Sequence, residues 1–178
     1  ECDWSSDVCS SDLEPTYQLH GHIARLTGAT VAEGERASDF TLDLAEVRRV
    51  LAEAEPTVTF LCSPNNPTGL VEPESNVREV LAMVPGLLLV DEAYGQFAEW
   101  SALGLVDDDV PMAVSRTFSK TWSMAGSRLG YLVGPSWLVA ELDKVVLPYH
   151  LDVAKQIAGR LALRFVDQME DRVNTIVT

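Results

Sequence analysis

Polar and charged side chains follow directly after several short apolar runs of this sequence. Two amides lie in SPNNPTG (63–69), two carboxylates and a tyrosine in DEAY (91–94), and a serine and a lysine in FSK (118–120). Arg128 opens the next apolar run. Each group alone has an ordinary role as a turn, a helix cap or a solvated charge. Together, an amine that can act as a nucleophile, carboxylates, and donors that can hold an anion are the components of a catalytic site.

The apolar runs that precede these groups are predicted to be strands. They are rich in β-branched and aliphatic residues and end at turn formers or charges: TVTFLC (57–62), GLLLVDEAY (86–94), PMAVSRTFSK (111–120) and SRLGYLVG (127–134). Stretches with helical spacing of apolar residues lie between and around them, at 17–28, 44–55, 72–84, 135–147 and 152–169. Asp43 is placed to cap the helix at 44–55.

Strands that alternate with helices predict an α/β protein with a mainly parallel sheet. The apolar runs are nearly continuous, as in strands that are buried on both faces. Ligands of such sheets bind at the carboxyl ends of the strands. The polar groups described above therefore converge on one edge of the sheet.

The composition narrows the class of protein. The 178 residues suit one domain, or a large piece of one, and the net charge of -14 argues against binding to nucleic acids or anionic membranes. No apolar run approaches the roughly 20 residues that span a bilayer. Cys62 is the only cysteine in the body of the chain. We therefore expect a soluble cytoplasmic protein without disulfides, and without a metal site.

Three motifs, in this order, carry a resemblance to a known family. CSPNNPTG, VDEAY and SRTFSKTWSMAGSRLGYLVG resemble the fold-type I pyridoxal-phosphate (PLP) aminotransferases. The residues within these motifs, together with PTYQLH near the start, are most similar to those of the histidinol-phosphate aminotransferase branch. The resemblance covers residues 14 to about 170. It implies a three-layer α/β/α fold in which residues 14–178 form the central part of the large PLP-binding domain.

The resemblance assigns the central role to Lys120. In the family a lysine amine forms an imine with the cofactor aldehyde, and Lys120 occupies the matching position. A free lysine amine is protonated at neutral pH, so we expect burial against a cationic neighbour such as Arg128 to favour the neutral form. Lys120 would then carry the proton from the substrate α-carbon to the cofactor C4′ carbon.

Three further residues match positions that act on the cofactor ring. Asp91 would keep the pyridine nitrogen protonated, so that the ring can accept electrons. Tyr94 and Asn66 would donate to the phenolic oxygen of the ring, whereas Asn65 is expected to serve the turn. Tyr17 matches the aromatic residue that stacks on the ring.

The cofactor phosphate needs hydrogen-bond donors and positive charge. Ser119 and Arg128 match the phosphate ligands of the family, and Thr117 is expected to be a third. Arg116 is equally compatible with a surface charge. His20 and His22 match no role.

The resemblance also implies a substrate and an assembly. The implied reaction transfers an amino group between histidinol phosphate and 2-oxoglutarate in a homodimer. The family places a phosphate-binding segment and a partner-donated tyrosine upstream, and an arginine for the substrate carboxylate in a downstream small domain. Neither part is expected within these residues, so we expect the chain alone to be inactive, and its folding to be compromised. Aromatic-amino-acid aminotransferases, a threonine-phosphate decarboxylase and a PLP-sensing domain of transcription regulators remain alternatives.

The opening segment, residues 1–13, fits none of these roles. CDWSSDVCSSDL is poor in strand-forming residues where the family has a buried strand. Residues 3–13 correspond to the translation of a DNA string that resembles a common short-read sequencing adapter. We therefore expect residues 1–13 to be a non-native, disordered segment, to be left out of the fold.

Overall fold

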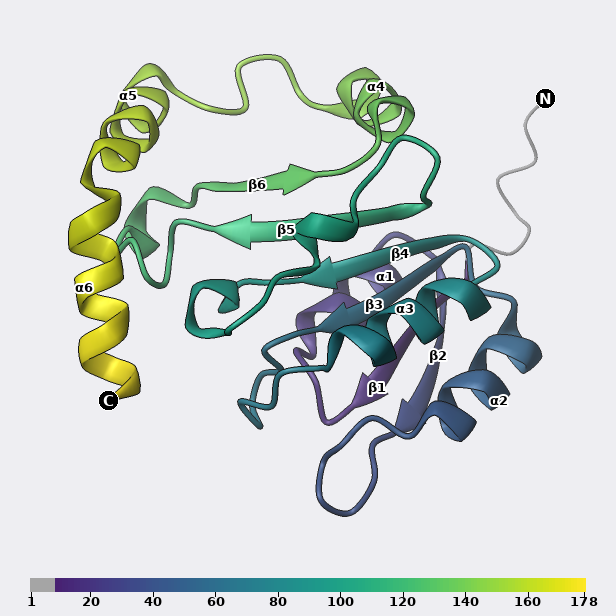
Figure 1. The fold of residues 1–178 in the computed structure, drawn as a ribbon. Coiled ribbons are helices and arrows are strands. Elements are labelled where there is room, and N and C mark those ends of the chain that lie inside the picture. Colours follow the sequence, from purple (N-terminus) through teal and green to yellow (C-terminus); the bar gives the residue numbers. More distant parts are fainter. Residues whose placement is uncertain (1–8) are drawn as a thin grey trace.

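The computed structural model of the chain describes residues 9–178, and its centre is a six-stranded sheet (Figure 1). The order across the sheet is β2-β1-β3-β4-β5-β6. The strands are β1 (Cys9–Glu14), β2 (Thr30–Glu35), β3 (Val58–Cys62), β4 (Leu87–Asp91), β5 (Met112–Thr117) and β6 (Gly130–Val133). Strands β1 to β5 pair in parallel, and β6 pairs antiparallel to β5. The predicted α/β class with a mainly parallel sheet is confirmed.

The described residues also form six α-helices and four short 3₁₀ turns. The helices are α1 (Leu19–Leu26), α2 (Leu44–Ala54), α3 (Glu74–Met83), α4 (Ser136–Val145), α5 (Val153–Ala162) and α6 (Val166–Val177). The 3₁₀ turns are η1 (Gly95–Phe97), η2 (Ala102–Leu105), η3 (Ala125–Ser127) and η4 (Leu163–Phe165). The predicted helix at 152–169 is divided by η4, and its second half continues beyond the predicted end.

Helices cover both faces of the sheet. A Cβ atom on Gly21 of α1 would lie within 3.6 Å of Val31 and Glu33, whereas a Cβ atom on Gly34 would meet Val50 of α2. Because successive strand residues point to opposite faces, α1 and α2 pack on opposite sides of β2. Helices α2 and α3 lie together on the near face in Figure 1. The arrangement is the expected three-layer α/β/α fold.

The core lies between the sheet and helices α2 and α3. Val77 and Val80 of α3 are buried, as are Leu88 and Val90 of β4. Each such side chain contributes about 2 kcal/mol of burial free energy. Asp43 caps α2 as predicted, because its carboxylate accepts hydrogen bonds from Ala45 N at 2.8 Å and from Glu46 N at 3.4 Å.

Two strands were not among the four predicted ones. Strand β2, TVAEGE, is half polar and contains Gly34, so its sequence lacks the apolar signal. Strand β1 includes part of the segment that we expected to be disordered, and for residues 9–13 that expectation is wrong. Its backbone pairs with β2 along the whole strand and with β3 at two positions, so ladder hydrogen bonds outweigh weak strand propensity. Residues 1–8 lie outside the described residues.

Candidate active site

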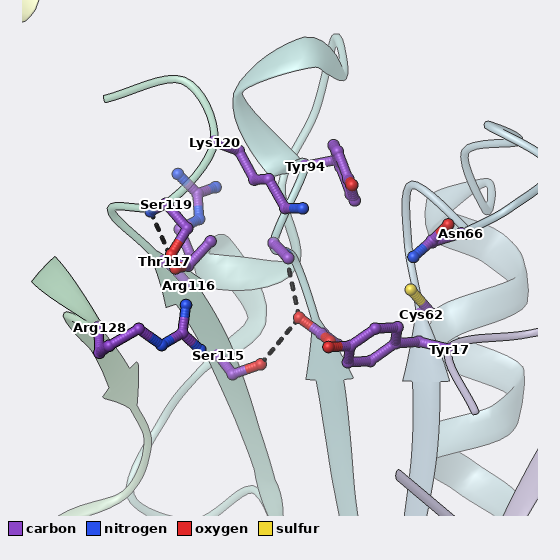
Figure 2. A pocket seen from close by; sticks show the side chains of 12 residues that line it. Tyr17, Cys62, Asn66, Tyr94, Ser115, Arg116, Thr117, Ser119, Lys120 and Arg128 are labelled. Carbon is purple, nitrogen blue, oxygen red and sulfur yellow. Dashed lines mark hydrogen bonds between the residues drawn. The ribbon is translucent and has the colours of Figure 1, made fainter. Parts of the chain in front are cut away.

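A pocket of about 230 Å³ lies at the carboxyl ends of β3, β4 and β5 (Figure 2). This is the edge that the sequence predicted. All eight predicted site residues line it: Tyr17, Asn66, Asp91, Tyr94, Thr117, Ser119, Lys120 and Arg128. Four further residues line it that were not predicted as ligands: Cys62, Ala93, Ser115 and Arg116. The predicted residues are thus brought together, although their individual roles remain predictions.

Asp91 ends β4 and points into the pocket. Its Oδ1 accepts hydrogen bonds from Ala93 N at 3.0 Å and from Ser115 Oγ at 3.1 Å. Its Oδ2 lies 3.0 Å from Nε2 of His20. Burial alone would raise the pKa of Asp91, but the hydrogen bond and charge of His20, with the bonds from Ala93 and Ser115, lower it below its ordinary value. Asp91 is therefore held as an oriented carboxylate.

His20, which matched no role in the sequence analysis, contacts the carboxylate of Asp91. Its Nδ1 lies 3.1 Å from Oδ2 of Asp12, on the side of the ring opposite Asp91. The ring stacks on Phe60 at a centroid distance of 4.6 Å and meets the edge of Tyr17 at 5.3 Å. Burial alone would lower the pKa of His20, but hydrogen bonds to the two carboxylates, and their charges, raise it to about 9. At neutral pH His20 is an imidazolium between two carboxylates.

Asn66, in the loop after β3, and Tyr17, just before α1, lie on one wall of the pocket (Figure 2). Asn65 is buried, and its Nδ2 donates to Pro15 O at 3.0 Å and to Thr68 Oγ1 at 2.8 Å. Asn65 thus serves the turn, as expected, and ties the loop to the segment that carries Tyr17. Asn66 is only partly buried, and Figure 2 shows its amide facing the pocket.

Lys120 extends over the pocket from the segment after β5. Its Nζ lies 4.8 Å from the centroid of the Tyr94 ring, which places the amine in cation–π range. The side chain is exposed, so the expected burial of Lys120 against a cation is not found within this chain.

The residues predicted to bind phosphate surround the turn that follows β5. Thr117 Oγ1 accepts from Ser119 N at 3.0 Å and donates to Leu129 O at 3.3 Å, so this hydroxyl already shapes the turn. Arg128 follows η3 with a left-handed backbone (φ 51°) and reaches toward Thr117 and Ser115 (Figure 2). Among residues 9–178, its guanidinium donates one hydrogen bond, from Nη1 to Ala125 O at 3.2 Å. Its other donors remain available to an anion.

The chemistry of the lining fits PLP. One side of the pocket offers Arg128, Ser119 and the amine of Lys120, which suit an anionic phosphate and an aldehyde. The other side offers the Asp91 carboxylate, held by His20, which suits a protonated ring nitrogen. Among residues 9–178, no cluster of three His, Cys, Asp or Glu side chains is arranged to hold a metal ion. In the same part of the chain, no helix has the length and apolarity needed to cross a membrane.

The family described as aminotransferase class I and II matches this chain over residues 12–178. The chain belongs to this family. It is 43% identical over 156 residues to the histidinol-phosphate aminotransferase of Nocardia farcinica, and 42% identical over 167 residues to that of Thermobifida fusca. These alignments cover 86% and 92% of this chain, but 40% and 46% of the relatives. The chain thus spans less than half the length of the curated relatives that it matches.

A solved structure shares the fold. The crystal structure of histidinol-phosphate aminotransferase from Sinorhizobium meliloti in complex with pyridoxal-5′-phosphate superposes with a TM-score of 0.84 at 23% identity. The superposition covers 94% of this chain and 46% of that chain. At this identity the likeness establishes the fold.

Proposed function

We propose that the whole protein is a PLP-dependent aminotransferase that transfers the amino group of histidinol phosphate to 2-oxoglutarate. One observation carries the proposal: a single pocket gathers the Lys120 amine, the oriented Asp91 carboxylate and the Arg128 guanidinium. The similarity to histidinol-phosphate aminotransferases of Nocardia farcinica and Thermobifida fusca supports the substrate.

Each lining residue then has a task. Bound PLP would supply an aldehyde that exchanges amines and a ring that withdraws electrons from the neighbouring carbon. Lys120 Nζ serves as the amine that holds the aldehyde and, when released, as the base that moves the proton. Asp91 accepts a hydrogen bond from the ring nitrogen. Ser119 and Arg128 hold the phosphate. Thr117 shapes the turn between them, and its hydroxyl joins them by turning from Leu129 O to the phosphate.

The remaining residues orient the ring. Tyr94 and Asn66 donate to its oxygen, and the exposed ring of Tyr17 lies at the mouth of the pocket, where it can stack on a flat ligand. The buried Cys62 thiol is a passive part of the floor, since burial and the charge of Asp91 raise its pKa to about 12.

We further propose a homodimer in the cytoplasm, as the family resemblance and the cysteine content imply. Exposed apolar residues on α5, such as Val153 and Ile157, are available for contacts with other parts of the whole protein. Light scattering of the whole protein tests the dimer.

The substrate is tested by following glutamate formation from 2-oxoglutarate with the whole protein and PLP. We expect kcat/KM for histidinol phosphate to exceed that for phenylalanine at least about tenfold, as is usual when buried polar groups recognise a substrate. A preference for phenylalanine would indicate an aromatic-amino-acid aminotransferase, and release of CO₂ from threonine phosphate a decarboxylase. PLP binding without turnover of any amine would favour a sensor domain.

A further inference from the structure

A largely buried ion pair lies one residue beyond Asp91. Arg116 Nε lies 3.0 Å, and Nη2 2.6 Å, from Oε2 of Glu92. The side chains of Arg116 and Glu92 are 12% and 4% exposed. The hydroxyl of Ser101 donates to the same carboxylate oxygen at 2.8 Å and accepts from Arg116 Nη2 at 2.8 Å. Arg116 is therefore no surface charge, and its charge is matched by Glu92 rather than left for a ligand.

The ion pair fastens the ends of β4 and β5 together. Asp91 and Ser115 are partners in the β4–β5 ladder, and Glu92 N donates to Ser115 O at 2.9 Å. Glu92 directly follows Asp91 at the end of β4, and Arg116 directly follows Ser115 within β5. Three interactions therefore join β4 and β5 where Asp91 enters the pocket: the strand ladder, the bond from Ser115 to Asp91, and the ion pair.

Glu92 and the ion pair also contact the backbone of the segment that follows Tyr94. Glu92 O accepts from Gly95 N at 2.9 Å, and Glu92 Oε1 accepts from Ala102 N at 2.6 Å. A Cβ atom on Gly95 would lie 2.9 Å from Glu92 Oε2 and 3.2 Å from Arg116 Nη2. The backbone that follows Tyr94 thus rests directly on the ion pair, and only a glycine fits there without displacement.

We propose that Glu92 and Arg116 are positioning residues, which hold the Tyr94 ring against the amine of Lys120. Tyr94 lies between Glu92, which is a member of the ion pair, and Gly95, which packs against the pair. The 4.8 Å contact from Lys120 Nζ to the Tyr94 ring therefore depends on the ion pair. Neither Glu92 nor Arg116 has to touch the reacting atoms. This inference rests on the proposed function, since the positioned groups act on PLP.

The test uses the whole protein with Glu92→Gln and Arg116→Lys. Lysine keeps the charge but lacks the two nitrogens that reach one carboxylate oxygen together. The matched controls are Glu74→Gln and Arg78→Lys, which alter an exposed ion pair on α3. Three properties are measured: folding by near-ultraviolet circular dichroism, PLP affinity by absorbance titration, and the rate at which an amine-specific reagent labels Lys120 in the PLP-free protein.

We expect folded Glu92→Gln and Arg116→Lys proteins to bind PLP about tenfold more weakly, the usual effect of losing a bond to a charged group. Labelling of Lys120 is expected to change in both, because its contact with Tyr94 is altered. Both controls should match the unmodified protein. In a Tyr94→Phe background, Glu92→Gln should change PLP affinity by less than its effect alone, since the hydroxyl that Glu92 helps to position is then absent.

Other results would overturn the proposal. Folded variants that keep the original PLP affinity and Lys120 labelling, even with lowered thermal stability, would show a structural role only. If either variant fails to fold, Ser101→Ala replaces it, with an expected loss of about threefold in PLP affinity and an altered labelling rate; no change in either property counts against the proposal. An unmodified protein that does not bind PLP would contradict the proposed function, whereas Lys120 labelling would still decide this inference.

Discussion

His20 Nε2 lies 3.0 Å from Asp91 Oδ2, although the two residues are 71 positions apart in the sequence. The other ring nitrogen of His20 faces Asp12 at 3.1 Å. The imidazolium is thus held between the buried carboxylate of Asp12 and the partly buried carboxylate of Asp91, stacked on Phe60. This arrangement keeps Asp91 charged and fixes the direction of its carboxylate, which is the property that a partner of a protonated ring nitrogen needs.

The charge of His20 makes stability depend on pH. Its pKa is raised from 6.5 to about 9 in the folded chain, so its contribution is fully present below pH 6.5 and is lost as the pH rises through 9. We expect His20→Gln to lower the free energy of unfolding by up to about 3 kcal/mol at pH 6, and by less at pH 10. Urea unfolding across this range measures the difference. His22→Gln, an exposed histidine on the same helix, is the control, and a pH-independent effect of His20→Gln would count against a charged His20.

Removing the charge of Asp91 should weaken the cofactor site more than removing the donor that orients it. We expect Asp91→Asn to lower PLP affinity at least about tenfold, and Ser115→Ala about twofold to threefold, since the serine supplies one of several bonds to Asp91. Asp91→Asn should also lower the pKa of His20, which nuclear magnetic resonance titration of the histidine would report. Equal PLP affinities for the two variants would contradict the role of the Asp91 charge.

Arg128 should determine the preference for a phosphorylated cofactor. We expect Arg128→Met to weaken PLP binding about tenfold or more, while binding of pyridoxal, which lacks the phosphate, changes little. The ratio of the two dissociation constants is the measurement. Arg78→Met, which removes an exposed arginine from α3, should leave the ratio unchanged. A parallel loss for both ligands would show that Arg128 serves the shape of the pocket rather than the phosphate.

The sequence was sufficient to predict those strands and helices that have a strong local pattern of apolar residues. Four strands and the helices were predictable because apolar periodicity and caps such as Asp43 are local properties. Strand β2 was not, since TVAEGE alternates too weakly and gains its place by pairing with β1. Residues 9–13 were predicted to be disordered for the same reason: backbone pairing with two neighbours does not appear in side-chain propensities.

The membership of the pocket was predictable, but its supporting contacts were not. The motifs that carry the family resemblance identified all eight predicted residues, and the structure brings these residues together at one edge of the sheet. His20 and Arg116 gain their importance from partners on other elements, Asp91 and Glu92, which no local pattern links to them. The exposure of Lys120 likewise depends on what covers the pocket, which is a tertiary property.

The position of Lys120 over the pocket is the central claim, and covalent trapping tests it most directly. The protein is incubated with PLP, reduced with borohydride, digested and examined by peptide mass spectrometry. The sequence holds three lysines, Lys120, Lys144 and Lys155. Lys144 is exposed on α4, where its amine pairs with Glu141. Lys155 lies on α5, where its amine pairs with Asp152. We expect the label on Lys120, and its loss in Lys120→Arg. A label on Lys144 or Lys155 instead, with Lys120 unmodified, would contradict the assignment.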